Sequence, residues 1–189
     1  MKKFTSLVPM LLIAMMALSL TSCDKDDMIS YSLEGTWRGD MKQRSTFNGK
    51  TYNVSYTELF FETDVFRTAT GHGKWIDFYS GAPYDYFASN IKWKVRDRVI
   101  YIEFLNGDKT QLEIRNYDLT DNYFWGKVWI QGSDSELEFS LRHVDSPNWN
   151  DYEWKGYHHY YLAPGYTMEG EQKPNKAPIA EPVRSLNND

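Results

Sequence analysis

One stretch of the sequence decides the fold: IKWKVRDRVIYIEF, residues 91–104. Apolar and polar side chains alternate on both sides of Asp97-Arg98, as in two half-buried strands joined by a two-residue turn. Such a turn makes three apolar cross-strand pairs: Val95 with Ile100, Trp93 with Ile102 and Ile91 with Phe104. The charged side chains of Lys92, Lys94 and Arg96 then point to the other face. The stretch therefore predicts an antiparallel hairpin with one buried apolar face.

The next two predicted hairpins keep the same face buried. An odd-length loop around Asn106-Gly107-Asp108 places the second strand of the first hairpin beside Thr110, Leu112 and Ile114. A four-residue loop, Gly132 to Ser135, gives the last hairpin these pairs: Ile130 with Leu137, Val128 with Phe139, Gly126 with Leu141 and Phe124 with His143. Since three successive hairpins agree on one buried face, the sequence favours a closed or nearly closed sheet.

Runs rich in Val, Ile, Thr and aromatic residues fill the chain from Leu33 to Val144, without a helical period. They cover residues 35–43, 51–62, 65–70, 74–79, 88–96, 99–105, 110–118, 123–131 and 136–144. If Gly71-His72-Gly73 is a bulge within one bent strand, the runs make eight strands. Short connections imply antiparallel neighbours. The predicted fold is therefore all-β, an eight-stranded antiparallel up-and-down barrel.

The N-terminus has the features of an export signal over residues 1–22. Lys2 and Lys3 supply the positive start, and an uncharged run from Leu7 to Leu20 follows, which is too short to span a bilayer. The next residues, Leu20-Thr21-Ser22-Cys23, resemble the lipobox of bacterial lipoproteins. By that resemblance Cys23 is acylated and becomes the first residue of the mature protein, so the membrane is a partner through the lipid. A secreted protein with a stray cysteine is the alternative.

An acidic run, Asp24-Lys25-Asp26-Asp27, follows the cysteine within a segment, residues 23–32, that we expect to be a lipid-anchored linker. The run resembles the export signal that routes lipoproteins of Bacteroidota to the cell surface. We therefore expect a lipid anchor in the outer membrane with the domain on the cell surface. The periplasmic face is the alternative, and enterobacterial sorting rules would instead imply retention at the inner membrane.

Composition excludes several classes of protein. One cysteine among 189 residues cannot form a disulfide framework or a Cys-rich zinc site. A formal charge of −5 provides no basic surface for nucleic acid, and it becomes more negative once Lys2 and Lys3 leave with the signal.

The C-terminal part of the chain divides in two. Residues 148–166 hold seven aromatic residues, and we assign them to the same domain as the barrel, over 33–166, packed against its outer face. Residues 167–189 lack aromatics and contain Pro174, Pro178 and Pro182, so we expect a disordered tail.

The segment Leu33-Glu34-Gly35-Thr36-Trp37 resembles the Gly-x-Trp start of lipocalin-like (calycin) barrels. Further stretches, Gly73 to Tyr79, Trp93-Lys94-Val95 and Phe124-Trp125-Gly126, are similar to small lipocalin-like lipoproteins of Bacteroidota. The resemblance implies that Gly35 and Trp37 form the barrel-start motif at the closed end. It also implies an Arg of the last strand over Trp37, for which Arg142 is the candidate, although the predicted register sends Arg142 outward.

Catalytic motifs are missing from the sequence. It has no Gly-rich phosphate loop, no Gly-x-Ser-x-Gly elbow and no His-Glu-x-x-His pair. The predicted register leaves the inner face almost without acids, so a catalytic carboxylate pair is not favoured. The four histidines do not favour a metal site: the adjacent His158 and His159 point to opposite sides of an extended chain, His72 lies between two glycines, and His143 falls on the inner face. We therefore predict a non-catalytic protein with no cofactor and no metal.

Two binding hypotheses remain. In the first, the barrel interior binds a small apolar or amphipathic ligand. The candidate lining residues are Trp93, Ile102, Phe104, Ile114, Asn116, Val128, Phe139 and His143. In the second, exterior aromatics bind a glycan or a partner protein of an outer-membrane complex; the candidates are Trp125, Trp129, Trp149 and Trp154. Each has a simpler alternative, because bulky residues can fill the barrel and the C-terminal aromatics can merely cover Trp125 and Trp129.

Overall fold

The computed structural model describes residues 25–65, 67–105, 111–131, 135–152, 159–162 and 183–185. A helix covers residues 25–33, and a short 3-10 helix covers Trp149–Asp151. The strands are β1 Gly35–Asp40, β2 Arg44–Phe47, β3 Lys50–Asp64, β4 Arg67–Tyr79, β5 Tyr84–Arg96, β6 Val99–Phe104, β7 Gln111–Leu119, β8 Tyr123–Ile130, β9 Glu136–Val144, β10 His159–Leu162 and β11 Val183–Ser185.

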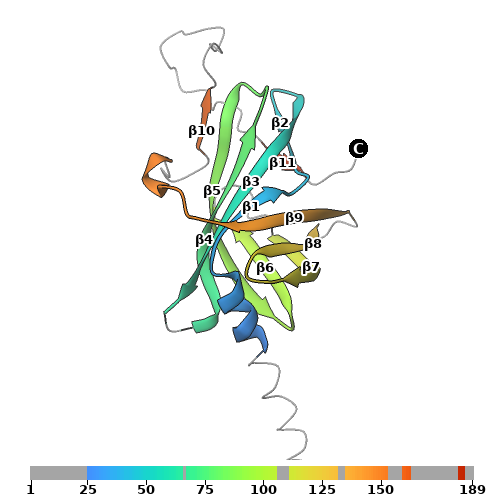
Figure 1. Ribbon diagram of the computed structural model, residues 1–189. Helices are drawn as coiled ribbons and strands as arrows, with labels where there is room; N and C mark the ends of the chain where they lie inside the picture. The colour runs from blue at the N-terminus through green and yellow to red at the C-terminus, as the bar shows by residue number, and fades with distance from the viewer. Residues whose placement is uncertain are drawn as a thin grey trace, which may run out of the picture.

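Eight antiparallel strands close into a barrel (Figure 1). Each strand from β3 to β8 pairs with the next along the chain, and β1 pairs with both β9 and β3. Three strands lie outside this ring: β2 forms a hairpin with β3, β11 pairs with β2, and β10 pairs with β5 beyond the end of β6. The predicted up-and-down barrel is confirmed.

The hairpin that decides the fold has the predicted register, with Val95 opposite Ile100 and Trp93 opposite Ile102. Both turn residues, Asp97 and Arg98, adopt positive φ angles of 53° and 62°, as a primed two-residue turn requires. The predicted pairing of Ile102 with Leu112 is also confirmed.

The β8–β9 hairpin differs from the prediction by two residues. Val128 lies opposite Leu137 and Phe124 opposite Leu141, so the predicted partners Phe139 and His143 are wrong. A shift of the pairing by two residues leaves every side chain on its predicted face. The buried face is therefore as predicted, although the contacts along it are not.

Strand β4 runs through Gly71-His72-Gly73 without the predicted bulge; its pairing with β3 shifts elsewhere, between Val54 and Tyr56 and between Thr63 and Asp64. The inward-facing Gly71 is needed because a Cβ there would meet the carbonyl oxygen of Glu62 at 2.0 Å and the Trp93 ring at 2.6 Å. The glycine makes room for that ring, whose Nε1 donates to the His72 carbonyl at 2.9 Å.

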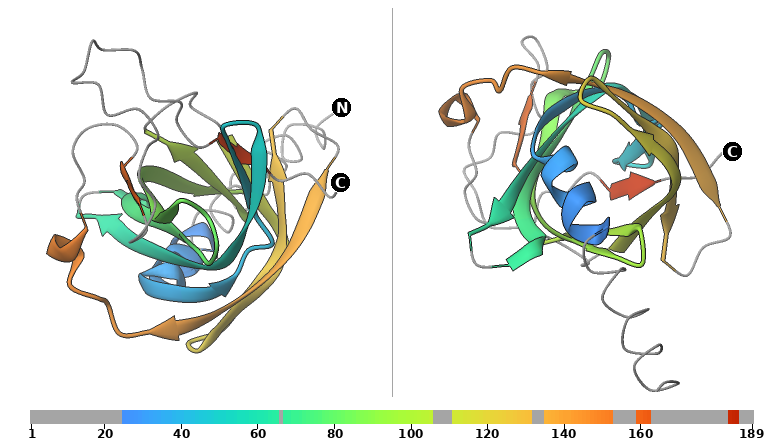
Figure 2. Two further views of the ribbon diagram at one scale, coloured as in Figure 1. Left: turned by 90° about the horizontal axis from the view of Figure 1, so that it is seen from above. Right: turned by 60° about the horizontal axis from the view of Figure 1, so that its bottom comes forward.

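The helix over residues 25–33 lies across the lower opening of the barrel (Figure 2). Leu33 is fully buried in the main core, and its carbonyl accepts a hydrogen bond from Trp37 Nε1 at 2.8 Å. The predicted linker, residues 23–32, is therefore largely a structural element that closes the barrel. Trp37 is at this closed end, as the barrel-start resemblance implied, but its ring contacts His143 at 4.9 Å, whereas Arg142 stacks outside over Tyr123.

The C-terminal part lies partly on the barrel, as predicted. Trp149 packs on Phe60 of β3, with ring centroids 5.2 Å apart, and Tyr152 packs on Tyr86 of β5 at 5.4 Å. The expected disordered tail needs one correction, because residues 183–185 form β11. The pairing of β11 with β2 brings a residue from near the end of the chain to the barrel interior.

Candidate functional site

The interior of the barrel has two chemically different halves. Near the helix, a large apolar cluster that includes Trp37, Ile102 and Phe139 fills the space. Near β2, a second buried cluster of Phe47, Tyr79, Ala82, Tyr84 and Phe87 is accompanied by polar side chains. These buried polar residues are Gln43, Ser45, Thr57, Asp77 and Ser89. The polar half is the candidate functional site.

Asp77 of β4 is the centre of this site. Its side chain is completely buried, at 0% exposure. One carboxylate oxygen, Oδ1, accepts hydrogen bonds from Thr57 Oγ1 and from Trp75 Nε1, both at 2.8 Å. These two donors come from the barrel wall, so β3 and β4 hold the carboxylate in one orientation. The second oxygen, Oδ2, remains for a group that enters the interior.

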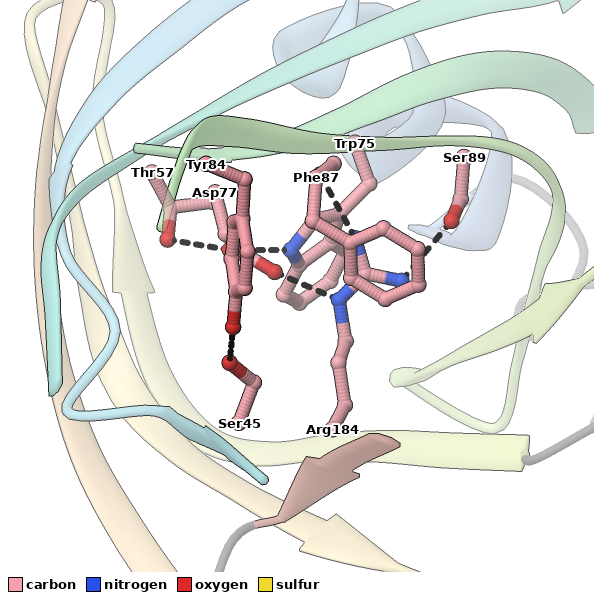
Figure 3. Close-up of polar contacts among 8 residues, drawn as sticks. All are labelled: Ser45, Thr57, Trp75, Asp77, Tyr84, Phe87, Ser89 and Arg184. Carbon is pink, nitrogen blue, oxygen red and sulfur yellow. Dashed lines mark hydrogen bonds and ion pairs between the residues drawn. The ribbon is translucent and has the colours of Figure 1, made fainter. Parts of the chain in front are cut away.

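The entering group is the side chain of Arg184 from β11 (Figure 3). Its Nε donates to Asp77 Oδ2 at 2.5 Å. Its two other nitrogens donate to the wall strand β5, Nη1 to Ser89 Oγ at 2.8 Å and Nη2 to the Phe87 carbonyl at 3.0 Å. The guanidinium carbon also lies 4.2 Å from the ring centroid of Phe87 and 4.6 Å from that of Phe104. Arg184 therefore meets a carboxylate, two oxygen acceptors and two aromatic rings.

The ion pair is necessary for a buried carboxylate. Removing an isolated carboxylate from water costs several kcal/mol, and only a partner cation with well-placed hydrogen bonds offsets that cost. The Arg184 side chain is 13% exposed, so this pair is shielded from solvent on both sides. Pairs in which charged groups share hydrogen bonds are about twice as strong as neutral ones. The interior of this barrel is therefore suited to a cation.

Polar groups continue beyond Asp77 toward β2. The hydroxyls of Ser45 and Tyr84 lie 2.5 Å apart. Burial raises the pKa of the Tyr79 hydroxyl, the nearby Asp77 raises it further, and Arg184 lowers it. Within the part of the chain that the structure describes, Gln43 Oε1 has no hydrogen-bond partner, although it is buried. Buried polar atoms of this kind are rare in folded proteins and suit a bound polar group.

Seven of the eight predicted lining residues of the interior fall into three sets. Five of them pack in the main core at the helix end: Trp93, Ile102, Ile114, Val128 and Phe139. Phe104 lies between the halves and contributes a ring to Arg184. His143 packs against Trp37 at the closed end but is exposed.

The inward position predicted for Asn116 is wrong. Asn116 is exposed, with a φ of 48°, in a bulge of β7 where the pairing shifts between Arg115 and Asp118. The bulge turns Tyr117 toward Phe124 of the core instead, with ring centroids 5.8 Å apart.

Sequence reasoning missed Asp77 and Arg184. Asp77 has the same parity in β4 as the inward Gly73 and Trp75, so alternation along the strand was the available signal. The expectation that the inner face is almost without acids is therefore wrong at Asp77. Nothing local indicated Arg184, because it follows a long polar segment and its partner lies 107 residues away.

The exterior aromatic candidates separate into two places. Trp149 lies over β3 and β4, with Lys74 Nζ 5.9 Å from its ring, and therefore does not cover β8. Trp125 of β8 stays 54% exposed beside a surface hollow of about 460 Å³. Trp129 is partly covered by Arg115, whose guanidinium carbon lies 5.7 Å from the ring. Trp154 and Cys23 lie outside the described residues, as does Asp24 of the acidic run.

Two kinds of feature are absent from the described ranges. No group of three or more His, Cys, Asp or Glu side chains among the described residues is arranged to hold a metal ion. None of the helices in that part of the chain has the length and apolar character needed to cross a membrane.

Comparison with known proteins identifies no relative: no family model, no curated protein and no solved structure matches the chain.

Proposed function

We propose that this protein is a non-catalytic, lipid-anchored lipoprotein of the lipocalin-like type, and that it binds one small amphipathic ligand inside its barrel. One observation carries the proposal: the half of the interior near β2 holds a polar side chain, Arg184, that the barrel wall does not itself supply. Eight-stranded barrels of this kind are just wide enough to hold one small molecule. Mixed rings and polar groups are the usual lining of such pockets.

The position of the site, at the end of the barrel opposite the proposed lipid anchor, supports a ligand that arrives from solution. Cys23, the proposed acylated residue, precedes the helix over 25–33 by two residues, and that helix lies across the lower end of the barrel. Strands β2 and β11, next to the site, lie at the other end (Figure 1). An anchor at Cys23 would therefore place the site away from the bilayer. We propose display on the cell surface, with the periplasmic face as the alternative.

Ligand binding is tested with four probes that share an eight-carbon chain: octylguanidinium, octylammonium, octanol and octanoate. The protein carries Cys23→Ser, which prevents acylation, and binding is measured by titration calorimetry. At least one probe should bind with one-to-one stoichiometry. If none of the four binds to folded protein, with Arg184 present or replaced, the interior-ligand proposal is refuted.

Location is a separate test. Protease added to intact cells should remove the domain if it is displayed on the surface. Protection in intact cells, followed by cleavage after the outer membrane is opened, would place it on the periplasmic face.

A second candidate function is favoured by the hollow beside Trp125. Its lining combines an exposed indole with acids, amines and an amide, including Asp40, Lys42, Asn116 and Glu138. Such a set suits a sugar ring, which stacks on the indole and hydrogen-bonds through its hydroxyls. Under this alternative the protein is an accessory subunit that binds glycan or a protein of an outer-membrane complex.

The alternative is tested by Trp125→Ala, with Trp149→Ala as the matched control on the other patch. Polysaccharide retention on an affinity gel should fall in the first variant only. Equal retention by both variants and by the parent protein would contradict a glycan site at Trp125.

A further inference from the structure

We infer that the interior site is specific for a guanidinium group, and that Arg184 is its built-in occupant, which an external guanidinium ligand must displace. The inference rests on the proposed ligand binding and adds the chemical class of the ligand. It follows from the contacts of the Arg184 head group, which is the one group seen in the site.

The contacts match a planar cation with donors in its plane. The nitrogens of Arg184 reach three different acceptors, Asp77 Oδ2, Ser89 Oγ and the Phe87 carbonyl. The rings of Phe87 and Phe104 lie 4.2 and 4.6 Å from its central carbon. Guanidinium groups combine in-plane donation with stacking on aromatic rings, whereas an ammonium group is a compact, strongly hydrated charge. A carboxylate or an alcohol in this position would leave Asp77 without a partner cation.

The barrel builds this site without help from β11. Thr57 and Trp75 orient Asp77 from β3 and β4, and Ser89 and Phe87 come from β5. Within the described residues, the strand that carries Arg184 pairs with three residues of β2, Arg44 to Thr46. The receptor for the cation is thus part of the closed sheet, while the cation is supplied by a short strand added at its edge. This arrangement allows the cation to be exchanged while the site remains.

Occupation by Arg184 and by an external ligand is mutually exclusive, because both need Asp77 Oδ2. A tethered group competes at an effective concentration on the order of millimolar. The apparent affinity for a ligand equals the intrinsic affinity multiplied by the fraction of molecules in which the site is empty. Release of β11 would therefore accompany ligand binding, and the tail would set the ligand concentration to which the protein responds.

The test compares octylguanidinium binding to the parent protein and to Arg184→Gln, both with Cys23→Ser. Removal of the occupant should tighten binding by at least about tenfold. The control, Arg142→Gln, removes an exposed arginine of β9 and should leave the affinity unchanged. In the Arg184→Gln background, octylammonium should bind at least about tenfold more weakly than octylguanidinium, and octanol and octanoate should not bind.

Asp77→Asn in the Arg184→Gln background supplies the second arm. This double variant leaves no buried charge in the site, so it should fold, and it should lose octylguanidinium binding. A third arm uses the parent protein alone: saturating octylguanidinium should speed amide hydrogen exchange at Arg184 and Ser185, since β11 must leave. This arm remains decisive even if Arg184→Gln fails to fold.

The outcomes separate the two proposals. Binding of octanol or octanoate that is indifferent to Asp77→Asn would overturn the guanidinium assignment and leave ligand binding intact. Equal octylguanidinium affinity with and without Arg184, or unchanged exchange in β11, would overturn the role of Arg184 as occupant. Absence of binding by all four probes, to parent and variants alike, would remove both proposals.

Discussion

The carboxylate of Asp26 joins the N-terminal helix to the turn that defines the fold. Asp26 is only 8% exposed, and its two oxygens accept hydrogen bonds from the backbone amides of Asp97 and Arg98, each at 2.9 Å. Those amides belong to the two-residue turn with positive φ angles, between β5 and β6. We predict that Asp26→Asn destabilises the barrel, because asparagine offers one oxygen and places an amide group against the other N–H.

The magnitude follows from the two bonds. A hydrogen bond to a charged group contributes about 1.5–3 kcal/mol, and an unsatisfied buried donor costs about 1–3 kcal/mol. Asp26→Asn weakens one bond and removes the other, so the free energy of unfolding should fall by about 2–3 kcal/mol. For a domain of this size each kcal/mol lowers Tm by about 3–4 °C, which gives a decrease of roughly 6–12 °C.

The assay is urea denaturation followed by circular dichroism, supported by thermal scans. Asp121→Asn is the matched control, since it removes the same charge from an exposed position between β7 and β8. The control should change the free energy of unfolding by less than about 0.5 kcal/mol. If Asp26→Asn also changes it by less than that, the clamp between helix and turn does not stabilise the fold and the reasoning is refuted.

The same residue affects any test of the proposed export signal. Asp24, Lys25, Asp26 and Asp27 form the acidic run, yet Asp26 is used inside the fold. A loss of surface display in Asp26→Asn would therefore combine misfolding with missorting. Comparison with Asp24→Asn at equal protein abundance separates the two causes.

Three further predictions concern the core, the sheet and the alkaline limit. Leu33→Ala removes a fully buried side chain where the helix meets the core and should cost about 3 kcal/mol in urea denaturation; a cost below about 1 kcal/mol would show that the helix is not docked. Gly39→Ala places a Cβ 2.1 Å from the Ser140 carbonyl oxygen and should lower the free energy of unfolding by about 2–3 kcal/mol. The control, Gly49→Ala, meets no atom within 4 Å but has a φ of 75°, and should lower it by about 1 kcal/mol. Equal decreases in the two variants would contradict the clash. Burial raises the pKa of Tyr117 from 10.0 to about 12, so its stabilising contribution is complete below pH 10 and is lost as the pH rises toward 12. Tyr117→Phe should reduce the fall in stability over that range, and an unchanged slope would argue against a neutral buried Tyr117.

Local sequence patterns predicted the barrel because alternation and turns determine the pairs between neighbouring strands. Alternation in residues 91–104 and the turn at Asp97-Arg98 determine which side chains meet, and the structure has those pairs. The β8–β9 register was wrong by two residues, since a shift of the pairing by two keeps every side chain on its face. Parity thus predicts faces better than it predicts partners.

The candidate site was harder to predict because its parts are distant in sequence. The apolar wall residues were correctly placed on the buried face, but burial alone does not distinguish a packed core from a binding pocket. Phe104 contacts Arg184, whereas Trp93 and Ile114 belong to the filled half. Asn116 was misplaced since a bulge reverses the alternation after Arg115.

The sequence by itself determined the eight strands of the barrel, their order and the buried face, because turns and alternation act between neighbours along the chain. Only the tertiary structure decided that residues 25–33 close the barrel, that Trp149 and Trp125 serve different surfaces, and that Asp77 receives Arg184. The physical reason is that a buried carboxylate needs a partner cation to offset its desolvation cost. The folded chain decides which cation reaches it. That choice depends on the closed barrel and the β2–β11 pairing, and no local pattern contains it.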